Sequence, residues 1–248
     1  CSEDVQFSEE QLSQASGNAE PSEDVQVDTE PDDEVPIKPV EADDSLVCVT
    51  GKKLGIWLDP SETGELIEEN YLGSIVSYSG DLDAQSNYNY FSASAHPIVG
   101  PEPVGFEANF FFYEGPDGLT LNFFANIDEG GSSDNQVDID IQSSGNQLQD
   151  VVLLSDDSGE ITLETTDAVQ QKNHYEGRFH YWKNTDGGVI GPFIGEDYRI
   201  QVKMLETGDN QNARFHSANG KTFTLKDNQE NISSFVIAFK KFELCEEK

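Results

Sequence analysis

Short runs of alternating apolar and polar residues, separated by turn signals, are the feature that most constrains the fold. Four turns join paired runs of this kind, which span residues 105–128, 150–165, 178–188 and 213–226. The turns read GPDG, DDSG, NTDGG and ANG, in which Gly or Asn supplies the positive φ that tight hairpins need. The best helical candidate, residues 61–75, is short. The sequence therefore predicts ten or more short antiparallel strands in one domain, arranged as a sandwich or a barrel.

Residues 1–47 differ in composition from the rest of the chain. They contain 15 acidic residues and four prolines, but only one basic residue, Lys38, and one aromatic residue, Phe7. Such a segment buries too little apolar surface to offset chain entropy, so we expect an acidic disordered tether before a folded domain at residues 48–248. The whole chain has a formal net charge of −34. This charge repels phosphate backbones and anionic lipids, and it excludes nucleic acid as a partner.

The sequence given opens on a cysteine that precedes a polar, acidic stretch, CSEDVQFSEE. This opening resembles that of mature bacterial lipoproteins, in which the first cysteine carries lipid and a polar tether follows. The resemblance implies lipidation of Cys1, with the lipid anchor as the only contact with the membrane. In that family a serine at the second position, here Ser2, is compatible with sorting to the outer membrane. We therefore expect an outer-membrane lipoprotein of the bacterial cell envelope, facing the periplasm or exposed at the surface.

Two further cysteines, Cys48 and Cys245, stand near the two ends of the expected folded domain. In an exported protein they can form a disulfide with each other, while Cys1 is used by lipid. This pairing accounts for the odd number of cysteines. It also predicts that the first strand, near residues 45–53, lies beside the last strand, near residues 234–244.

Three stretches resemble the concanavalin A-like superfamily of lectins and glucanases. They are VGFEANFFFYEGPDGLTLNFFA (104–125), DNQVDIDIQSSGNQLQD (134–150) and EDYRIQVKMLETGDNQNARFHSANGKTFTL (196–225). The resemblance implies an all-β fold, an antiparallel jelly-roll β-sandwich, and a concave face that binds carbohydrate. It also matches Asp117, in the PDGL segment, to a sugar-binding aspartate of that superfamily.

The stretch HYEGRFHYWKN, residues 174–184, is dense in side chains that can bind a ligand. Because side chains alternate across a strand, it separates into an apolar side with Tyr175, Gly177, Phe179 and Tyr181, and a polar side. In a concave sheet, the polar side would form a row of sugar-binding groups: His174, Glu176, Arg178, His180 and Trp182. The alternative is an ordinary solvated face on which the tryptophan covers a neighbouring hairpin.

A second polar row lies on residues 136–142, where Gln136, Asp138, Asp140 and Gln142 alternate with apolar residues. The laminarinase-like enzymes of the superfamily carry Glu-x-Asp-x-Glu here, with the catalytic carboxylates at its ends. Gln136 takes one of these places and cannot act as a carboxylate nucleophile. The lectin pattern instead implies a Ca²⁺ site with oxygen ligands from Asp138, Asp140, Asn146 and Asp150. The acidic loop with Asp128, Glu129 and Asp134 offers rival ligands.

These patterns lead to one main functional hypothesis, which is non-catalytic binding of a polysaccharide or other glycan at the cell surface. The first alternative is a polysaccharide-degrading enzyme on the same scaffold, either a glycosidase or a lyase. A lyase would use His174, Arg178, His180 and Tyr181, although Tyr181 points to the opposite face from His180. The second alternative is a structural or adhesive envelope protein that binds another protein.

Overall fold

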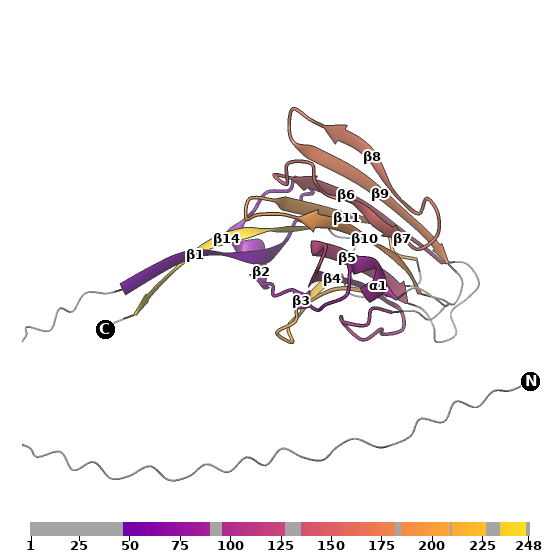
Figure 1. Ribbon diagram of the computed structural model, residues 1–248, viewed down its shortest axis with the longest axis horizontal. Coiled ribbons are helices and arrows are strands. Elements are labelled where there is room, and N and C mark those ends of the chain that lie inside the picture. The colour runs from indigo at the N-terminus through magenta and orange to yellow at the C-terminus, as the bar shows by residue number, and fades with distance from the viewer. Residues whose placement is uncertain are drawn as a thin grey trace, which may run out of the picture. The chain divides into compact units, whose positions relative to one another are not determined.

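The computed structural model describes residues 47–89, 96–126, 135–181, 185–208, 210–226 and 234–246. Within these ranges the chain is nearly all β, as predicted, with strands arranged in two large sheets (Figure 1). The predicted lipidation site Cys1 and the tether lie outside the described residues, as do Trp182 and the loop with Asp128, Glu129 and Asp134. No helix in the described part of the chain is long and apolar enough to cross a membrane.

The first sheet, sheet A, contains seven strands in the order β2-β1-β14-β11-β6-β9-β8. In that order its strands are β2 (Tyr71–Ser74), β1 (Val47–Leu58), β14 (Ser234–Glu246), β11 (Arg199–Glu206), β6 (Asn135–Ser144), β9 (Lys172–Tyr181) and β8 (Ile161–Asp167). All six neighbouring pairs of this sheet are antiparallel. The first strand β1 pairs with the last strand β14 along its whole length, which confirms the predicted neighbourhood of the chain ends.

The second sheet, sheet B, has the order β13-β12-β4-β5-β10-β7, with β3 beside β4. Its strands are β13 (Thr222–Lys226), β12 (Asn212–His216), β4 (Glu107–Gly115), β5 (Gly118–Asn126), β10 (Thr185–Phe193), β7 (Val151–Ser155) and β3 (Tyr78–Ser79). Strand β4 runs parallel to both β12 and β3, so this sheet is mixed. The helical segments are the 3₁₀ turn η1 (Glu68–Asn70) and the short helix α1 (Ala84–Tyr88).

Turn chemistry predicted two of the four hairpins correctly. Strands β4 and β5 pair across Pro116 and Asp117, and β12 pairs with β13. The hairpins expected at 150–165 and 178–188 are wrong, because β7 and β10 belong to sheet B whereas β8 and β9 belong to sheet A. In both cases the chain crosses from one sheet to the other. The best helical candidate, residues 61–75, is helical only at η1, and β2 follows it directly.

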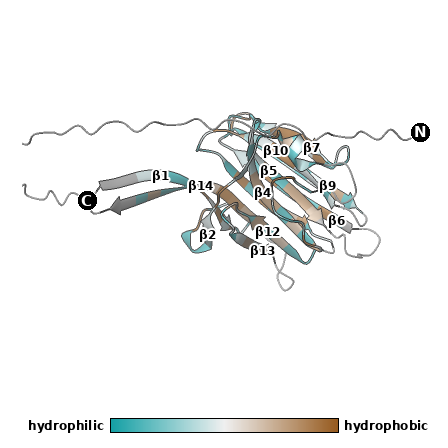
Figure 2. Ribbon diagram, turned by 60° about the horizontal axis from the view of Figure 1, so that its bottom comes forward, coloured by the Kyte–Doolittle hydropathy of each residue, from teal (hydrophilic) through white to brown (hydrophobic). Residues whose placement is uncertain are grey.

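The core lies between the two sheets and is rich in phenylalanine. Phe110 of β4 packs against Phe235 of β14 with ring centroids 5.1 Å apart, and Phe123 of β5 packs against Phe179 of β9 at 4.9 Å. Both pairs join sheet B to sheet A, so the two sheets form a sandwich. Hydrophobic residues gather on the central strands of the sandwich (Figure 2).

The outer faces of the two sheets differ in how they are covered. On sheet B, helix α1 places Tyr88 against Phe111, Phe124 and Val189, and these side chains form a second apolar cluster. Strand β4 is therefore buried on both faces, as its run of aromatic residues requires. On sheet A, β9 instead alternates between buried and accessible residues. The fold thus leaves the outer face of β9 and its neighbours available as a site.

Candidate functional site

The outer face of sheet A presents polar side chains from three adjacent strands, β11, β6 and β9. We call this surface the polar face. Strand β9 follows the predicted alternation, since Tyr175 and Phe179 are fully buried while His174, Glu176 and Arg178 are half-buried. The residues of the polar face are Gln136, Asp138, Asp140, Gln142, Ser144, Lys172, His174, Glu176, Arg178, His180, Arg199, Gln201 and Lys203. Four of the five predicted row residues therefore share one face.

Strand register places these side chains in rungs across the sheet. Asp138 lies opposite Arg178, and Asp140 lies between Glu176 on β9 and Lys203 on β11. Neighbouring strands are about 4.8 Å apart, so side chains in one rung are in reach of each other. The two polar rows predicted separately from residues 136–142 and 174–184 are therefore one continuous surface.

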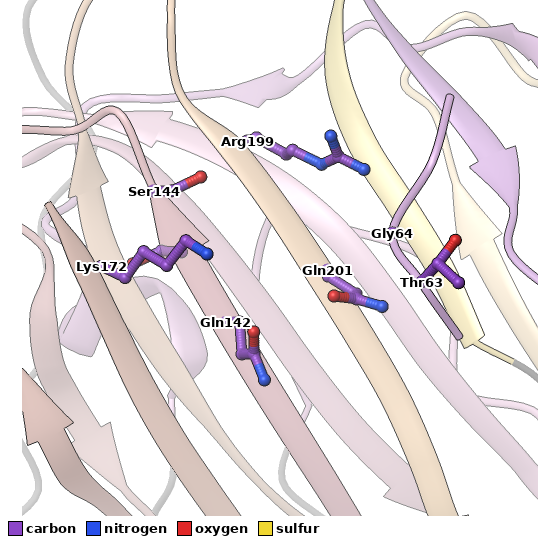
Figure 3. Close-up of a pocket in the computed structure, with 8 residues that line it drawn as sticks. Thr63, Gly64, Gln142, Ser144, Lys172, Arg199 and Gln201 are labelled. Atoms are coloured by element: carbon purple, nitrogen blue, oxygen red, sulfur yellow. The ribbon is translucent and has the colours of Figure 1, made fainter. Parts of the chain in front are cut away.

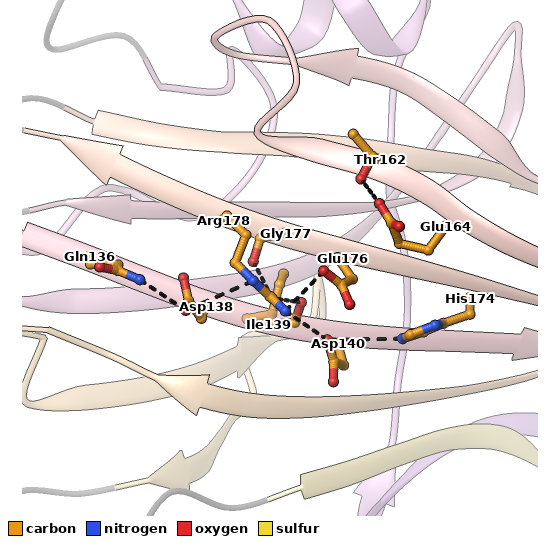
Figure 4. A network of polar contacts seen from close by, with 10 residues as sticks. All are labelled: Gln136, Asp138, Ile139, Asp140, Thr162, Glu164, His174, Glu176, Gly177 and Arg178. Atoms are coloured by element: carbon orange, nitrogen blue, oxygen red, sulfur yellow. Dashed lines mark hydrogen bonds and ion pairs between the residues drawn. The ribbon is translucent and has the colours of Figure 1, made fainter.

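Arg178 sits at the centre of an ion-pair network on this face (Figure 4). Its guanidinium lies 3.1 Å from a Glu176 carboxylate oxygen, 3.5 Å from Asp140 and 3.9 Å from Asp138. Its Nη1 also donates to the carbonyl oxygens of Ile139 and Gly177, at 3.2 and 3.0 Å. A guanidinium held by five acceptors has little freedom, so it fixes three carboxylates in place.

Gln136 and His174 extend the network in opposite directions along the strands. Gln136 Nε2 donates to Asp138 at 2.9 Å, and His174 Nε2 lies 3.9 Å from Asp140 Oδ1. One ligand atom each from Asp140, His174 and Glu176 lie within 4.8 Å of one another, which is a possible set for a metal ion. Arg178 already supplies positive charge to two of these residues, so a bound ion would compete with its guanidinium.

The residues expected to hold Ca²⁺ do not come together. Asp138 and Asp140 lie on the polar face, whereas Asn146 and Asp150 are almost completely buried. The carboxylate of Asp150 accepts hydrogen bonds from Tyr175, at 2.8 Å, and from Asn146, at 3.0 Å, and it also bonds to Ser143. The chain enters the interior of the sandwich after Ser144, at the end of β6, and Asp150 forms its hydrogen bonds there. The four-residue site is therefore not formed as predicted.

Asp117 lies at the turn between β4 and β5, on sheet B. Its Oδ2 accepts a hydrogen bond of 2.8 Å from the backbone amide of Ala84, where helix α1 begins. The polar face belongs to the other sheet, so the structure does not bring Asp117 together with the row on β9. The observed role of this carboxylate is to hold α1 on its sheet.

A small cavity opens at the end of the polar face where β11 and β6 meet the loop after β1 (Figure 3). Its volume is about 190 Å³, and it is lined by Thr63, Gly64, Gln142, Ser143, Ser144, Lys172, Arg199 and Gln201. Asp59, which is 1% exposed, holds the loop by accepting from Gly64 N at 2.5 Å and from Gln201 Nε2 at 3.0 Å. The sequence reading missed this cavity, because Asp59 and Gln201 are 142 residues apart in the chain.

A second polar cluster, also missed from sequence, lies where β4 and β12 run side by side. Glu107 accepts from Arg214 Nε at 2.7 Å, and His216 Nε2 lies 2.7 Å from Asn109 Oδ1. Burial raises the pKa of Glu107, but hydrogen bonds from His216 and Arg214 outweigh burial and hold this pKa below its usual value. The alternation of polar and apolar residues in NARFH and FEAN was the sequence pattern that could have indicated this cluster. The charged groups of this cluster bind one another, so we interpret the cluster as a structural ion pair.

Comparisons with protein-family models, with curated proteins and with solved structures find no match to this chain. A functional assignment therefore depends on the geometry of its sites. The polar face combines accessible hydrogen-bonding groups from three strands with a cavity at one end.

Proposed function

We propose that this protein binds carbohydrate, without catalysis, through the polar face of sheet A. The observation that carries the proposal is the network around Arg178, which holds carboxylate and imidazole groups in one plane of the sheet. Sugar hydroxyls both donate and accept hydrogen bonds, so a fixed array of such groups suits them. Groups held on strands also lose less freedom on binding than groups on loops.

The two-sheet all-β architecture is compatible with the resemblance to concanavalin A-like lectins. The jelly-roll connectivity and a concave shape for the polar face are part of the proposal. Calcium binding, which the resemblance implied, stays a prediction that now involves Asp138 and Asp140 alone. The outer-membrane setting also stays a prediction.

Two observations favour binding over cleavage. Gln136 occupies a place at which the related glucanases carry a carboxylate, and it donates to Asp138 instead. Tyr181, which a lyase of the expected kind would use, is buried on the core side of β9, and its hydroxyl lies 2.6 Å from Asn210 Nδ2. Neither residue is placed to break a glycosidic bond.

One observation also favours a glycan over a protein partner. The cores of protein interfaces are depleted in charged residues and enriched in aromatic ones. The described part of the polar face carries charged or amide side chains along β6 and β9 and no apolar anchor. A hydrated, hydroxyl-rich ligand fits such a surface better.

The test is binding to an array of neutral and acidic oligosaccharides, followed by calorimetry with the oligosaccharide that binds best. We expect the wild-type protein to bind. The double variant Asp140→Asn/His174→Ala should bind about tenfold or more weakly, because hydrogen bonds to charged groups contribute roughly 1.5–3 kcal/mol each.

The matched control is Glu102→Gln, which removes an exposed carboxylate elsewhere on the chain. This control should bind as the wild type does. Thermal melting of all three proteins checks that they are folded. Absence of binding to every oligosaccharide, or equal binding by the double variant, would contradict the proposal.

A further inference from the structure

The cavity at the end of the polar face has a charge opposite to that of the protein. The chain contains 48 acidic and 14 basic residues, yet the lining of this cavity contains one arginine, one lysine and no acidic side chain. The rest of the lining is glycine or uncharged polar residues. Such a local excess of positive charge is unexpected in an acidic protein unless it meets an anion.

The two cations lie in a single rung of the sheet. Arg199 on β11 is the cross-strand partner of Ser144 on β6, and Ser144 is in turn the partner of Lys172 on β9. The two cationic residues are therefore two strand spacings apart, or about 10 Å between Cα atoms. Figure 3 shows the Lys172 amine over β6 near Ser144, and the Arg199 guanidinium directed toward the loop with Gly64, on the other side of the cavity. Both side chains line the same cavity, from opposite sides.

The guanidinium of Arg199 has no hydrogen-bond or ion-pair partner among the residues that the structure describes. The carboxylate that favours its charge, Asp59, already accepts from Ser61, Gly64 and Gln201. Arg199 is partly buried, and this burial lowers the pKa of its guanidinium. A guanidinium that is partly buried and unpaired is prepared to bind a carboxylate or sulfate, with two parallel hydrogen bonds.

The remaining lining residues give the cavity a definite size and a connection to the polar face. Gly64 has φ +75°, and a Cβ there would lie 3.1 Å from both Arg199 Nη2 and Gln201 Oε1. Glycine at this position therefore keeps the wall clear. Gln142 belongs both to the cavity lining and to the rung that contains His174. The volume of about 190 Å³ is below the roughly 300–1,000 Å³ of sites for drug-sized ligands, so it suits one charged group rather than a whole oligosaccharide.

We infer that Arg199 and Lys172 bind the acidic group of a sugar unit, a carboxylate or a sulfate ester, so that the ligand of the polar face is an anionic glycan. This inference rests on the proposed function, because the rest of the oligosaccharide would lie along β6 and β9. The negative charge of the protein would then contribute to specificity, since it repels polyanions from the surface except at this end of the polar face.

The test is calorimetry at fixed ionic strength with two matched pairs of probes. One pair is trigalacturonic acid and its methyl ester, and the other is a sulfated carrageenan tetrasaccharide and the same molecule after desulfation. We expect at least one acidic probe to bind about tenfold or more tightly than its neutral partner. The preferred pair identifies the acidic group as carboxylate or sulfate.

Variants of the cavity residues test whether the preference for the acidic probe arises in the cavity. Arg199→Gln and Lys172→Gln should each reduce binding of the preferred acidic probe, by about tenfold for Arg199, and should reduce binding of its neutral partner much less. The control Lys221→Gln removes an exposed positive charge next to strand β13 and should have no effect. Thermal melting confirms that each variant is folded.

The outcomes separate this inference from the function on which it rests. Neutral probes could bind as tightly as acidic ones, with binding that is still weakened by the His174 variant. This result would contradict the inference of an anionic ligand but agree with carbohydrate binding by the polar face. The same holds if Arg199→Gln has no effect, or if Lys221→Gln loses as much binding as Arg199→Gln. If no probe of either kind binds, both proposals fail.

Discussion

Arg178 shows at the scale of single residues how this chain makes an ordered site from like charges. Asp138, Asp140 and Glu176 would repel one another on a bare strand pair, and the guanidinium between them offsets that repulsion. Arg199 differs from Arg178 because its guanidinium is partly buried but forms no ion pair among the described residues. The first arginine organises the polar face, and the second is available to a ligand.

Asp186 gives a prediction on stability at the same scale. It is 3% exposed, and burial together with the nearby carboxylates of Glu160 and Asp156 raises its pKa. The folded protein therefore holds this proton at a pH where the unfolded chain releases it, above about pH 3.9. Stability from this residue is fully present below that pH and is lost as pH rises. Asp186→Asn should raise the melting temperature at pH 7, and the gain should shrink toward pH 4.

The measurement is thermal melting of both proteins between pH 4 and pH 8. Asp157→Asn is the matched control, because Asp157 is an exposed acid in the neighbouring turn. Its effect should vary much less with pH. A gain for Asp186→Asn that is the same at every pH would contradict the assignment.

At the scale of elements, the pair β1 and β14 extends beyond the rest of sheet A (Figure 1). Strand β2 pairs only with Gly55–Trp57 of β1, and β11 pairs only with Ser234–Ala238 of β14, among the residues described. The outer half is therefore a two-stranded ribbon, which is marginal by itself in water. Cys48 and Cys245 are direct cross-strand partners near its end.

This register supports the predicted disulfide between Cys48 and Cys245. Directly opposed residues of antiparallel strands have Cα atoms about 4.5–5.5 Å apart, within the range that a disulfide spans. We expect peptide mapping without reductant to find the two cysteines linked in protein from an oxidising compartment. Reduction should lower the melting temperature. Free thiols at both positions would contradict the pairing.

The elements also show which parts of the fold were readable from sequence. Strand periodicity predicted the two faces of β9 because each residue obeys a local rule, and Tyr175 and Phe179 lie in the core as expected. Turn chemistry was less informative. DDSG reverses the chain in either case, but whether β8 returns beside β7 or joins the other sheet depends on distant partners, here β9 and β10.

The difference between local patterns and distant partners also explains which parts of the candidate site were predicted from the sequence. The row on β9 was predicted because its members are alternate residues of one strand, close together in the sequence. The Arg199 cavity was not, since it needs a loop near residue 64, the end of β6 and the start of β11 to meet. The four predicted Ca²⁺ ligands are separated in the structure for the opposite reason. They are near one another in sequence, but the chain turns into the core between Asp140 and Asp150.

At the scale of the whole molecule, the sandwich is asymmetric. One outer face is covered by α1 and its neighbours, with Tyr88 fully buried, and the other presents the polar face. This asymmetry predicts that ligand binding is confined to sheet A. The negative charge of the remaining surface repels an anionic ligand, so such a ligand would be confined to the end of the polar face that carries Arg199 and Lys172.

The most direct test of carbohydrate binding by the polar face is NMR mapping of backbone amides during titration with the best-binding oligosaccharide. We predict shifts that concentrate on β6, β9 and β11, including Gln142, His174 and Gln201, with the outer face of sheet B unchanged. Shifts centred on β4, β5 and α1, or no saturable shift on β6 and β9, would contradict the account.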